Sequence, residues 1–131
     1  MACWISRGNR RLEAYCAPGP ATDAELHETL FPDTYHLKLP RYHESIEEAW
    51  KIVEELRRRR IELSVKSVED LDSTKNCCDE LIKLHNEGMK YCVQAWDKYE
   101  QRYGAAIYGR TGPEAICGMA IHLIEMNKVT K

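Results

Sequence analysis

The stretch YGRTGPEAICGMAIHLIEM, residues 108–126, is the part of the chain around which we expect the fold to be organised. Thr111 followed by Glu114 is the pattern of a capping box, and Pro113 suits the first turn of a helix. Apolar residues then recur on one broad face: Ile116, Cys117, Met119, Ala120, Ile121, Leu123 and Ile124. The stretch therefore predicts a helix over residues 112–126 that packs on a sheet.

The start of this helix is a candidate anion site. Free helix N–H groups would lie there beside Arg110, between two flexible glycines, Gly109 and Gly112. The pattern also fits a well-capped core helix that holds no ligand, and this plainer interpretation is the favoured one. Glu114 weighs against a ligand as well, because its carboxylate would compete for the same N–H groups.

Length and charge limit the classes of protein to consider. A chain of 131 residues fits a single domain over residues 1–131 with one core. Its 19 basic and 21 acidic residues give a formal net charge of -2, so nucleic acid is a disfavoured partner. No apolar run is long enough to span a membrane, and the N-terminus lacks the apolar middle of a signal peptide. We expect a cytoplasmic protein without a membrane partner.

The cysteines are numerous but scattered. The 6 positions show none of the CxxC spacing of zinc or redox sites: Cys3, Cys16, Cys77, Cys78, Cys92 and Cys117. We expect reduced thiols, no metal and no cofactor. A zinc site from Cys77 or Cys78 with His85 and Cys92 can be drawn, but it is the less favoured alternative.

The N-terminal third of the chain carries few regular patterns. Residues 1–20 show no sustained period, so we expect an irregular N-terminal arm or short extended pieces there. Thr22 with Glu25 forms a capping box that predicts a short helix, which Pro32 ends.

A strand, a helix and a second strand are expected next. Apolar and polar residues alternate over residues 35–39 and again over residues 61–66, which is the period of a half-buried strand. Between them, Ser45 with Glu48 predicts the start of a helix over residues 45–60. We expect one core that combines this helix with the C-terminal one through Trp50, Val53, Leu56, Ile116, Ala120 and Leu123.

The remaining segments predict an inserted helix and a hairpin. Residues 74–87 have a helical apolar face that ends at Gly88. Residues 89–98 and 103–108 alternate on either side of a polar link and predict a β-hairpin. The fold class is therefore α+β, with a three- or four-stranded, mainly antiparallel sheet and helices packed on it as an α/β sandwich.

The hairpin and its exit supply the candidate ligand-binding residues. Cations and a helix start could hold a phosphate or carboxylate, and aromatic rings could stack on a planar group. The candidates are Arg110, Thr111, Gly112, Tyr108, Arg102, Trp96 and Tyr103. For the aromatic residues, cross-strand packing within the sheet is the competing and slightly favoured interpretation.

Two segments resemble a family of small phage and prophage proteins, the phage ABA sandwich domain. They are LPRYHESIEEAWKIVEEL with its following strand, and YGAAIYGRTGPEAICGMAIHLIE. The resemblance covers roughly residues 35–66 and 89–125. It implies an α/β sandwich of phage origin, and hence the host cytoplasm, but no settled activity. The N-terminal thirty residues and the inserted helix depart from the family pattern.

The sequence favours a non-enzymatic function. It contains no GxSxG, HExxH, Walker or glycine-rich dinucleotide motif, and the five histidines are dispersed. No catalytic residue is assigned, although His43 and Glu44 precede a helix start, where they form either a site pair or a solvated N-terminus. His122 is expected as a core or boundary histidine.

The first hypothesis is a small phage-type binding protein that sequesters an anionic or nucleotide host signalling molecule in an anti-defence role. This step rests on the resemblance and on the missing catalytic motifs. The alternative is a protein–protein interaction or self-assembling module, in which the chain docks on a host protein or on a second copy of itself.

Overall fold

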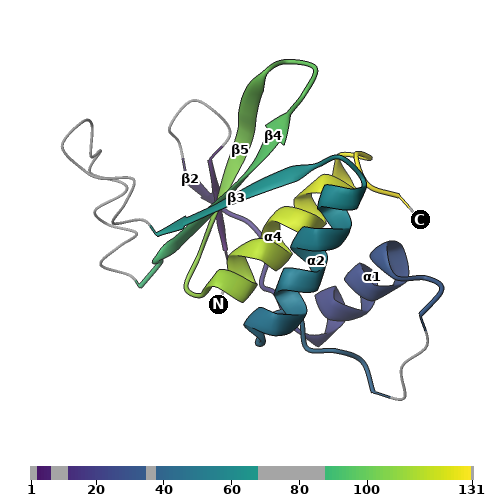
Figure 1. Ribbon diagram of the computed structural model, residues 1–131. Helices are drawn as coiled ribbons and strands as arrows, with labels where there is room; N and C mark the ends of the chain where they lie inside the picture. Colours follow the sequence, from purple (N-terminus) through teal and green to yellow (C-terminus); the bar gives the residue numbers. More distant parts are fainter. Residues whose placement is uncertain (1–2, 7–11, 35–37, 68–87, 131) are drawn as a thin grey trace.

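A computed structural model of the protein describes residues 3–6, 12–34, 38–67 and 88–130. Its elements in chain order are β1 (Trp4–Ser6), β2 (Leu12–Ala14), α1 (Pro20–Leu30), α2 (Ile46–Arg58), β3 (Glu62–Ser67), β4 (Tyr91–Asp97), β5 (Arg102–Gly109) and α4 (Gly112–Glu125). Within these ranges, three helices pack on an open, five-stranded antiparallel sheet (Figure 1). The predicted α+β class is therefore confirmed.

The sheet has more strands than the sequence indicated. Its strand order is β2-β1-β5-β4-β3, and every neighbouring pair is antiparallel. The predicted hairpin is the β4–β5 pair, and the predicted strand after the second helix is β3. Of the two alternatives expected for residues 1–20, the irregular arm is wrong where the structure describes them and the short extended pieces are confirmed, because β1 pairs with β5 and β2 pairs with β1.

Side-chain caps begin two of the helices as predicted. Ser45 Oγ accepts a hydrogen bond from the Glu48 N–H at 3.4 Å, and Thr111 Oγ1 accepts one from the Glu114 N–H at 3.2 Å. Each bond satisfies one of the helix N–H groups that lack an intrahelical partner. These caps set the entry points of α2 and α4.

Helix α1 begins earlier than its predicted cap. Pro20 occupies the first turn after Gly19, and Thr22 lies inside the helix. The Thr22 hydroxyl reaches back and accepts a hydrogen bond from the Gly19 N–H at 2.7 Å. The prediction of Thr22 as the residue that precedes the helix is thus wrong by one turn, because proline is pre-organised for the first helical position.

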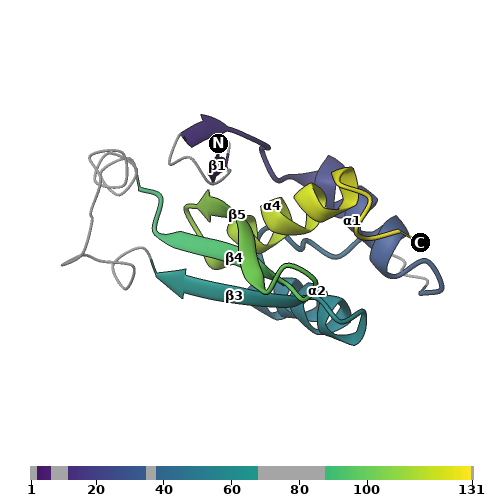
Figure 2. The same ribbon diagram turned by 90° about the horizontal axis from the view of Figure 1, so that it is seen from above.

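The helices cover one face of the sheet (Figure 2). Cross-strand pairing aligns Val65, Val93, Ile107 and Ile5 in one row. The last three are buried in the main core with the apolar face of α4, and Val65 packs against that core. Helix α4 packs on β4 and β5, whereas α2 packs on β3 and α4. The main core therefore lies between the helical layer and a single face of the sheet.

Five of the six predicted core residues are buried, and the prediction for Trp50 is wrong. Trp50 is 44% exposed, whereas Ala49, Val53 and Leu56 are at most 2% exposed. Successive helix positions differ by about 100° around the axis, so Trp50 points well away from Ala49. The small Ala49 lets the buried face of α2 lie close to its neighbours, and the indole stays on the flank.

Some predictions fall wholly or partly outside the described residues. The inserted helix at 74–87 lies outside them, as do Cys77, Cys78 and His85 of the drawn zinc site. For the strand predicted at 35–39, residues 35–37 lie outside, and Lys38 and Leu39 are not in a strand. Among the helices that the structure describes, none is long and apolar enough to cross a membrane.

Candidate functional site

The structure does not bring the predicted cations together. Arg102 begins β5 and Arg110 follows its last residue, so about 25 Å of extended chain separates them. Arg102 is exposed at the hairpin turn, where its guanidinium lies 2.7 Å from Glu100 Oε2. Arg102 therefore cannot act as a second cation beside Arg110.

The start of α4 offers little to an anion. The Glu114 N–H already donates to Thr111 Oγ1, and the Ala115 N–H donates to the Thr111 carbonyl at 3.1 Å. Pro113 has no N–H. Only the Gly112 N–H remains from the first turn, and Gly112 is buried beside the Ile46 side chain. The cap thus satisfies most of the groups that the anion hypothesis required.

The two glycines of this turn are packed rather than flexible. Among the described glycines only Gly88 has a positive φ, so Gly109 and Gly112 adopt backbone conformations open to any residue. A Cβ at Gly109 would lie 2.9 Å from the Ala115 nitrogen. Gly109 is needed for the close approach of β5 to α4. Beside it, Arg110 Nε is buried without a hydrogen-bond partner among the described residues.

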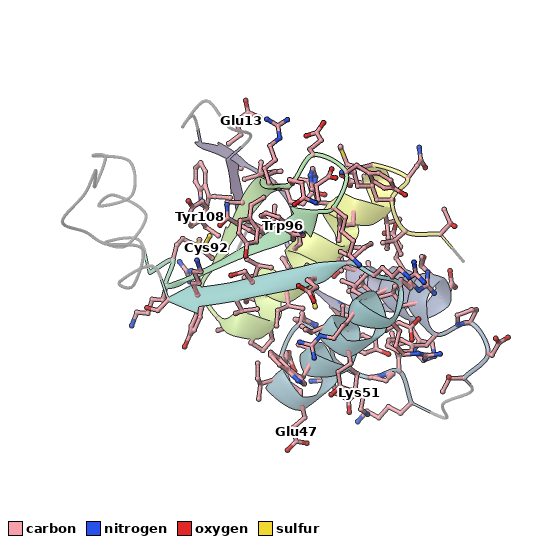
Figure 3. The ribbon with its side chains drawn as sticks, turned by 45° about the horizontal axis from the view of Figure 1, so that its top comes forward. Glu13, Glu47, Lys51, Cys92, Trp96 and Tyr108 are labelled. Carbon is pink, nitrogen blue, oxygen red and sulfur yellow. The ribbon has the colours of Figure 1, made fainter. Side chains whose placement is uncertain are left out.

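The sheet face opposite the helices is here called the open face. Alternation along the strands places the polar and aromatic partners of the core residues on it. Three cross-strand rows follow from the register: Lys66, Cys92, Tyr108 and Trp4; Ser64, Gln94 and Ala106; Glu62, Trp96 and Tyr103. Figure 3 labels Cys92, Trp96 and Tyr108, whose side chains gather over β4 and β5.

Lys66, Trp96 and Tyr103 form what we call the aromatic–lysine cluster. The Trp96 and Tyr103 rings meet edge to face, with centroids 5.0 Å apart and an interplanar angle of 74°. Lys66 Nζ lies 6.0 Å from the centre of the Tyr103 ring, within cation–π range. Tyr103 is 43% exposed, so one aromatic surface beside a cation remains accessible.

The neighbouring end of the open face is a small apolar core. Met89, Cys92, Ala106 and Tyr108 are buried there, with Trp4 packed against them. Tyr108 is 8% exposed and therefore presents little ring surface to a ligand, unlike Tyr103. Burial raises the pKa of the Cys92 thiol to about 11. For Tyr108, the competing prediction of cross-strand packing is the better description.

Asp23 and His43 form a buried polar contact that the sequence did not reveal. Asp23 is 1% exposed; its carboxylate accepts from the His43 backbone N–H at 3.1 Å and lies 2.5 Å from His43 Nδ1. The other ring nitrogen, Nε2, lies 3.4 Å from Glu44 Oε1. A catalytic histidine would present Nε2 to a nucleophile, whereas this one faces a carboxylate. The pair joins α1 to the turn before α2.

Two other histidines are parts of the packing. His122 is 9% exposed and meets the Tyr15 ring edge to face at 5.8 Å, so the core or boundary position predicted for it is confirmed. His27 Nδ1 lies 2.8 Å from the hydroxyl of the buried Tyr42. Burial also raises the pKa of this tyrosine, which favours its neutral form.

The four described cysteines are free thiols, and two of them adjoin each other. A Cβ at Gly118 would lie 3.2 Å from the Cys3 sulfur and 3.5 Å from the Cys16 sulfur. The hydrogen bond from Cys3 lowers the pKa of Cys16. The hydrogen bond with Cys16 and burial raise the pKa of Cys3, and burial raises that of Cys117. Cys16 is also partly exposed, unlike the other three.

We therefore expect Cys16 to be the first of these four cysteines to react with iodoacetamide in the folded protein. The thiolate is the reacting form, so alkylation of Cys16 should reach half its maximal rate at a lower pH than that of Cys92, whose pKa is about 11. Peptide mapping after limited alkylation at several pH values measures both rates. Faster labelling of Cys92 than Cys16 at neutral pH would contradict the assignment.

Among the described residues, no group of three or more His, Cys, Asp or Glu side chains is arranged to hold a metal ion. Comparisons with family models, curated proteins and solved structures give no match to this chain. Function must therefore be inferred from the residues themselves. The aromatic–lysine cluster combines the predicted Trp96 and Tyr103 with a cation that was not predicted, Lys66.

Proposed function

We propose that this protein is a non-enzymatic binding protein that holds a planar, anionic small molecule of the nucleotide class on its open face. The carrying observation is the aromatic–lysine cluster, in which Lys66 Nζ lies 6.0 Å from the ring of the exposed Tyr103. A base would stack on Tyr103, and a phosphate would pair with Lys66. Trp96, edge-on to Tyr103, holds that ring in place.

The wider role in this proposal is sequestration. The resemblance to small phage proteins suggests that the ligand is a host nucleotide signal and that binding removes it from the host cytoplasm in an anti-defence role. Sequestration needs affinity but no catalytic group, in keeping with a chain that lacks the common catalytic motifs.

One charge on the open face opposes an anion. Glu62 lies directly across from Trp96 in the β3–β4 register and is exposed. Its carboxylate would repel a phosphate held by Lys66, so Glu62→Gln should tighten binding of a nucleotide. If Glu62→Gln raises the affinity for a nucleotide, the charged group of the ligand lies near β3 on the open face.

The test is a thermal-shift panel of mono-, di- and cyclic nucleotides, followed by calorimetry on each nucleotide that raises the melting temperature. Loss of a stacked base contact in Tyr103→Ala should weaken binding by about 1–3 kcal/mol. Loss of the charged contact in Lys66→Gln should weaken it by about 1.5–3 kcal/mol. The matched control is Tyr99→Ala, which removes a 99% exposed tyrosine at the hairpin turn.

The variant Arg110→Ala distinguishes a ligand site on the open face from one at the start of α4. Binding on the open face predicts that Arg110→Ala keeps the affinity of the parent protein. A flat nucleotide panel would refute the proposed function. Weakening by Arg110→Ala but not by Tyr103→Ala would move the site to the helix start.

A further inference from the structure

Strand β3 is an edge strand of the sheet that the structure describes. In the part of the chain that the structure describes, it pairs only with β4, and it runs for 6 residues without a proline. The opposite edge strand, β2, has only 3 residues. Short edge strands resist pairing with other chains, whereas a long regular edge presents a row of unpaired backbone groups. The β3 edge is therefore the one suited to strand addition.

The residues of β3 complement a second copy of themselves. When two β3 strands pair antiparallel about a two-fold axis at Ser64, Glu62 lies opposite the second copy's Lys66 on the open face. The symmetry repeats this pair, and opposite charges across strands stabilise the pairing. On the other face, the same register sets Leu63 against the second copy's Val65. Both charges and apolar side chains therefore match in one register.

The helix beside this edge carries an exposed apolar flank. Ile46 and Trp50, one turn apart on α2, are 55% and 44% exposed. On the opposite flank, Arg59 donates to the carbonyls of Thr29 and Leu30 of α1 at 3.3 and 3.4 Å. Helix α2 packs on β3 and therefore lies beside this edge of the sheet (Figure 2). Pairing of two β3 strands would bring the two α2 helices toward each other across the axis.

We propose that the β3 edge, with Ile46 and Trp50 of α2, is a docking surface for a second copy of this chain. The product is a two-fold dimer with one continuous antiparallel sheet, in which Glu62 and Lys66 form two symmetric intermolecular ion pairs. The open faces of both copies lie on the same side of that sheet.

A charge exchange on the full chain tests this arrangement by sedimentation velocity over a range of concentrations. Glu62→Lys alone and Lys66→Glu alone each replace two attractive pairs by two repulsive ones, and should raise the dimer dissociation constant at least about tenfold. An equimolar mixture of the two variants should restore association as a heterodimer, because every lysine again faces a glutamate. Trp50→Gln, which leaves these charges unchanged, should also weaken the dimer.

Lys51→Glu is the control for net charge. Lys51 projects outward from α2, where it pairs with Glu48 and not with any residue of β3 among those described (Figure 3). Lys51→Glu changes the net charge by the same amount as Lys66→Glu. It should leave the dimer intact. A parent protein that is monomeric at every concentration, a mixture that fails to associate, or equal weakening by Lys51→Glu would each overturn the proposal. Lys66 belongs to the aromatic–lysine cluster as well as to the proposed dimer contact. Dimer association is therefore measured without nucleotide, and the ligand site is tested separately with Tyr103→Ala, which leaves Lys66 in place.

Discussion

Gly109→Ala is expected to destabilise the protein by about 3 kcal/mol, the upper end of the usual range for overpacking a core. The new Cβ would lie 2.9 Å from the nitrogen of Ala115 and 3.1 Å from its Cα and Cβ. These atoms belong to the first turns of α4, so relief requires movement of the helix rather than rotation of a side chain. Urea denaturation followed by circular dichroism measures the change in the free energy of unfolding.

Gly104→Ala is the matched control in the same strand. Within the described residues, no heavy atom lies within 4 Å of the position that its Cβ would take, and its φ is not in the left-handed region. The control should therefore change the free energy of unfolding by less than about 0.5 kcal/mol. Equal denaturation midpoints for the two variants would show that β5 and α4 can separate without cost, contrary to the packing described.

The elements that the sequence predicted correctly are those with a strong local signal. Ser45 and Thr111 cap α2 and α4 through side-chain bonds to residues three positions later, and this pattern is visible in the sequence. The β4–β5 hairpin shows as alternation over strands of 7 and 8 residues. Local chemistry decides these elements, so local reasoning finds them.

The missed elements depend on tertiary contacts. Strands β1 and β2 have only 3 residues each, too few for a period to appear. They exist because β1 adds to the edge of β5 and β2 adds to β1. Trp50 was misplaced because an apolar residue on a helix flank satisfies the same pattern as one in the core. Only the position of α2 over the sheet edge distinguishes the two.

The candidate site was predictable in its residue types but not in its layout. The geometry of an extended strand already implied that Arg102 and Arg110 are about 25 Å apart. The contact of Trp96 with Tyr103 depends on a register shift in the β4–β5 pair, which the sequence does not show. Lys66 lies on a strand outside the hairpin, so its place beside Tyr103 follows only from the strand order.

Asp23→Ala is expected to destabilise the protein by about 3 kcal/mol or more, because it leaves both the backbone N–H and the ring Nδ1 of a largely buried His43 without the acceptor they share. Each unsatisfied buried group costs about 1–3 kcal/mol. The pair spans 20 positions of the sequence and joins α1 to the turn before α2. Its loss should therefore loosen α1 first, which hydrogen exchange of the α1 amides would detect alongside urea denaturation.

Glu25→Ala on the same helix is the control, since it removes an exposed carboxylate from α1 and should change stability by less than about 0.5 kcal/mol. Asp23→Asn should fall between the two, because the amide oxygen still accepts one hydrogen bond from His43. The double variant Asp23→Ala/His43→Ala should cost less than the sum of the single changes, because neither partner is left alone in it. If the losses in the free energy of unfolding are additive, Asp23 and His43 act independently. Their contact would then not be what holds α1 in place.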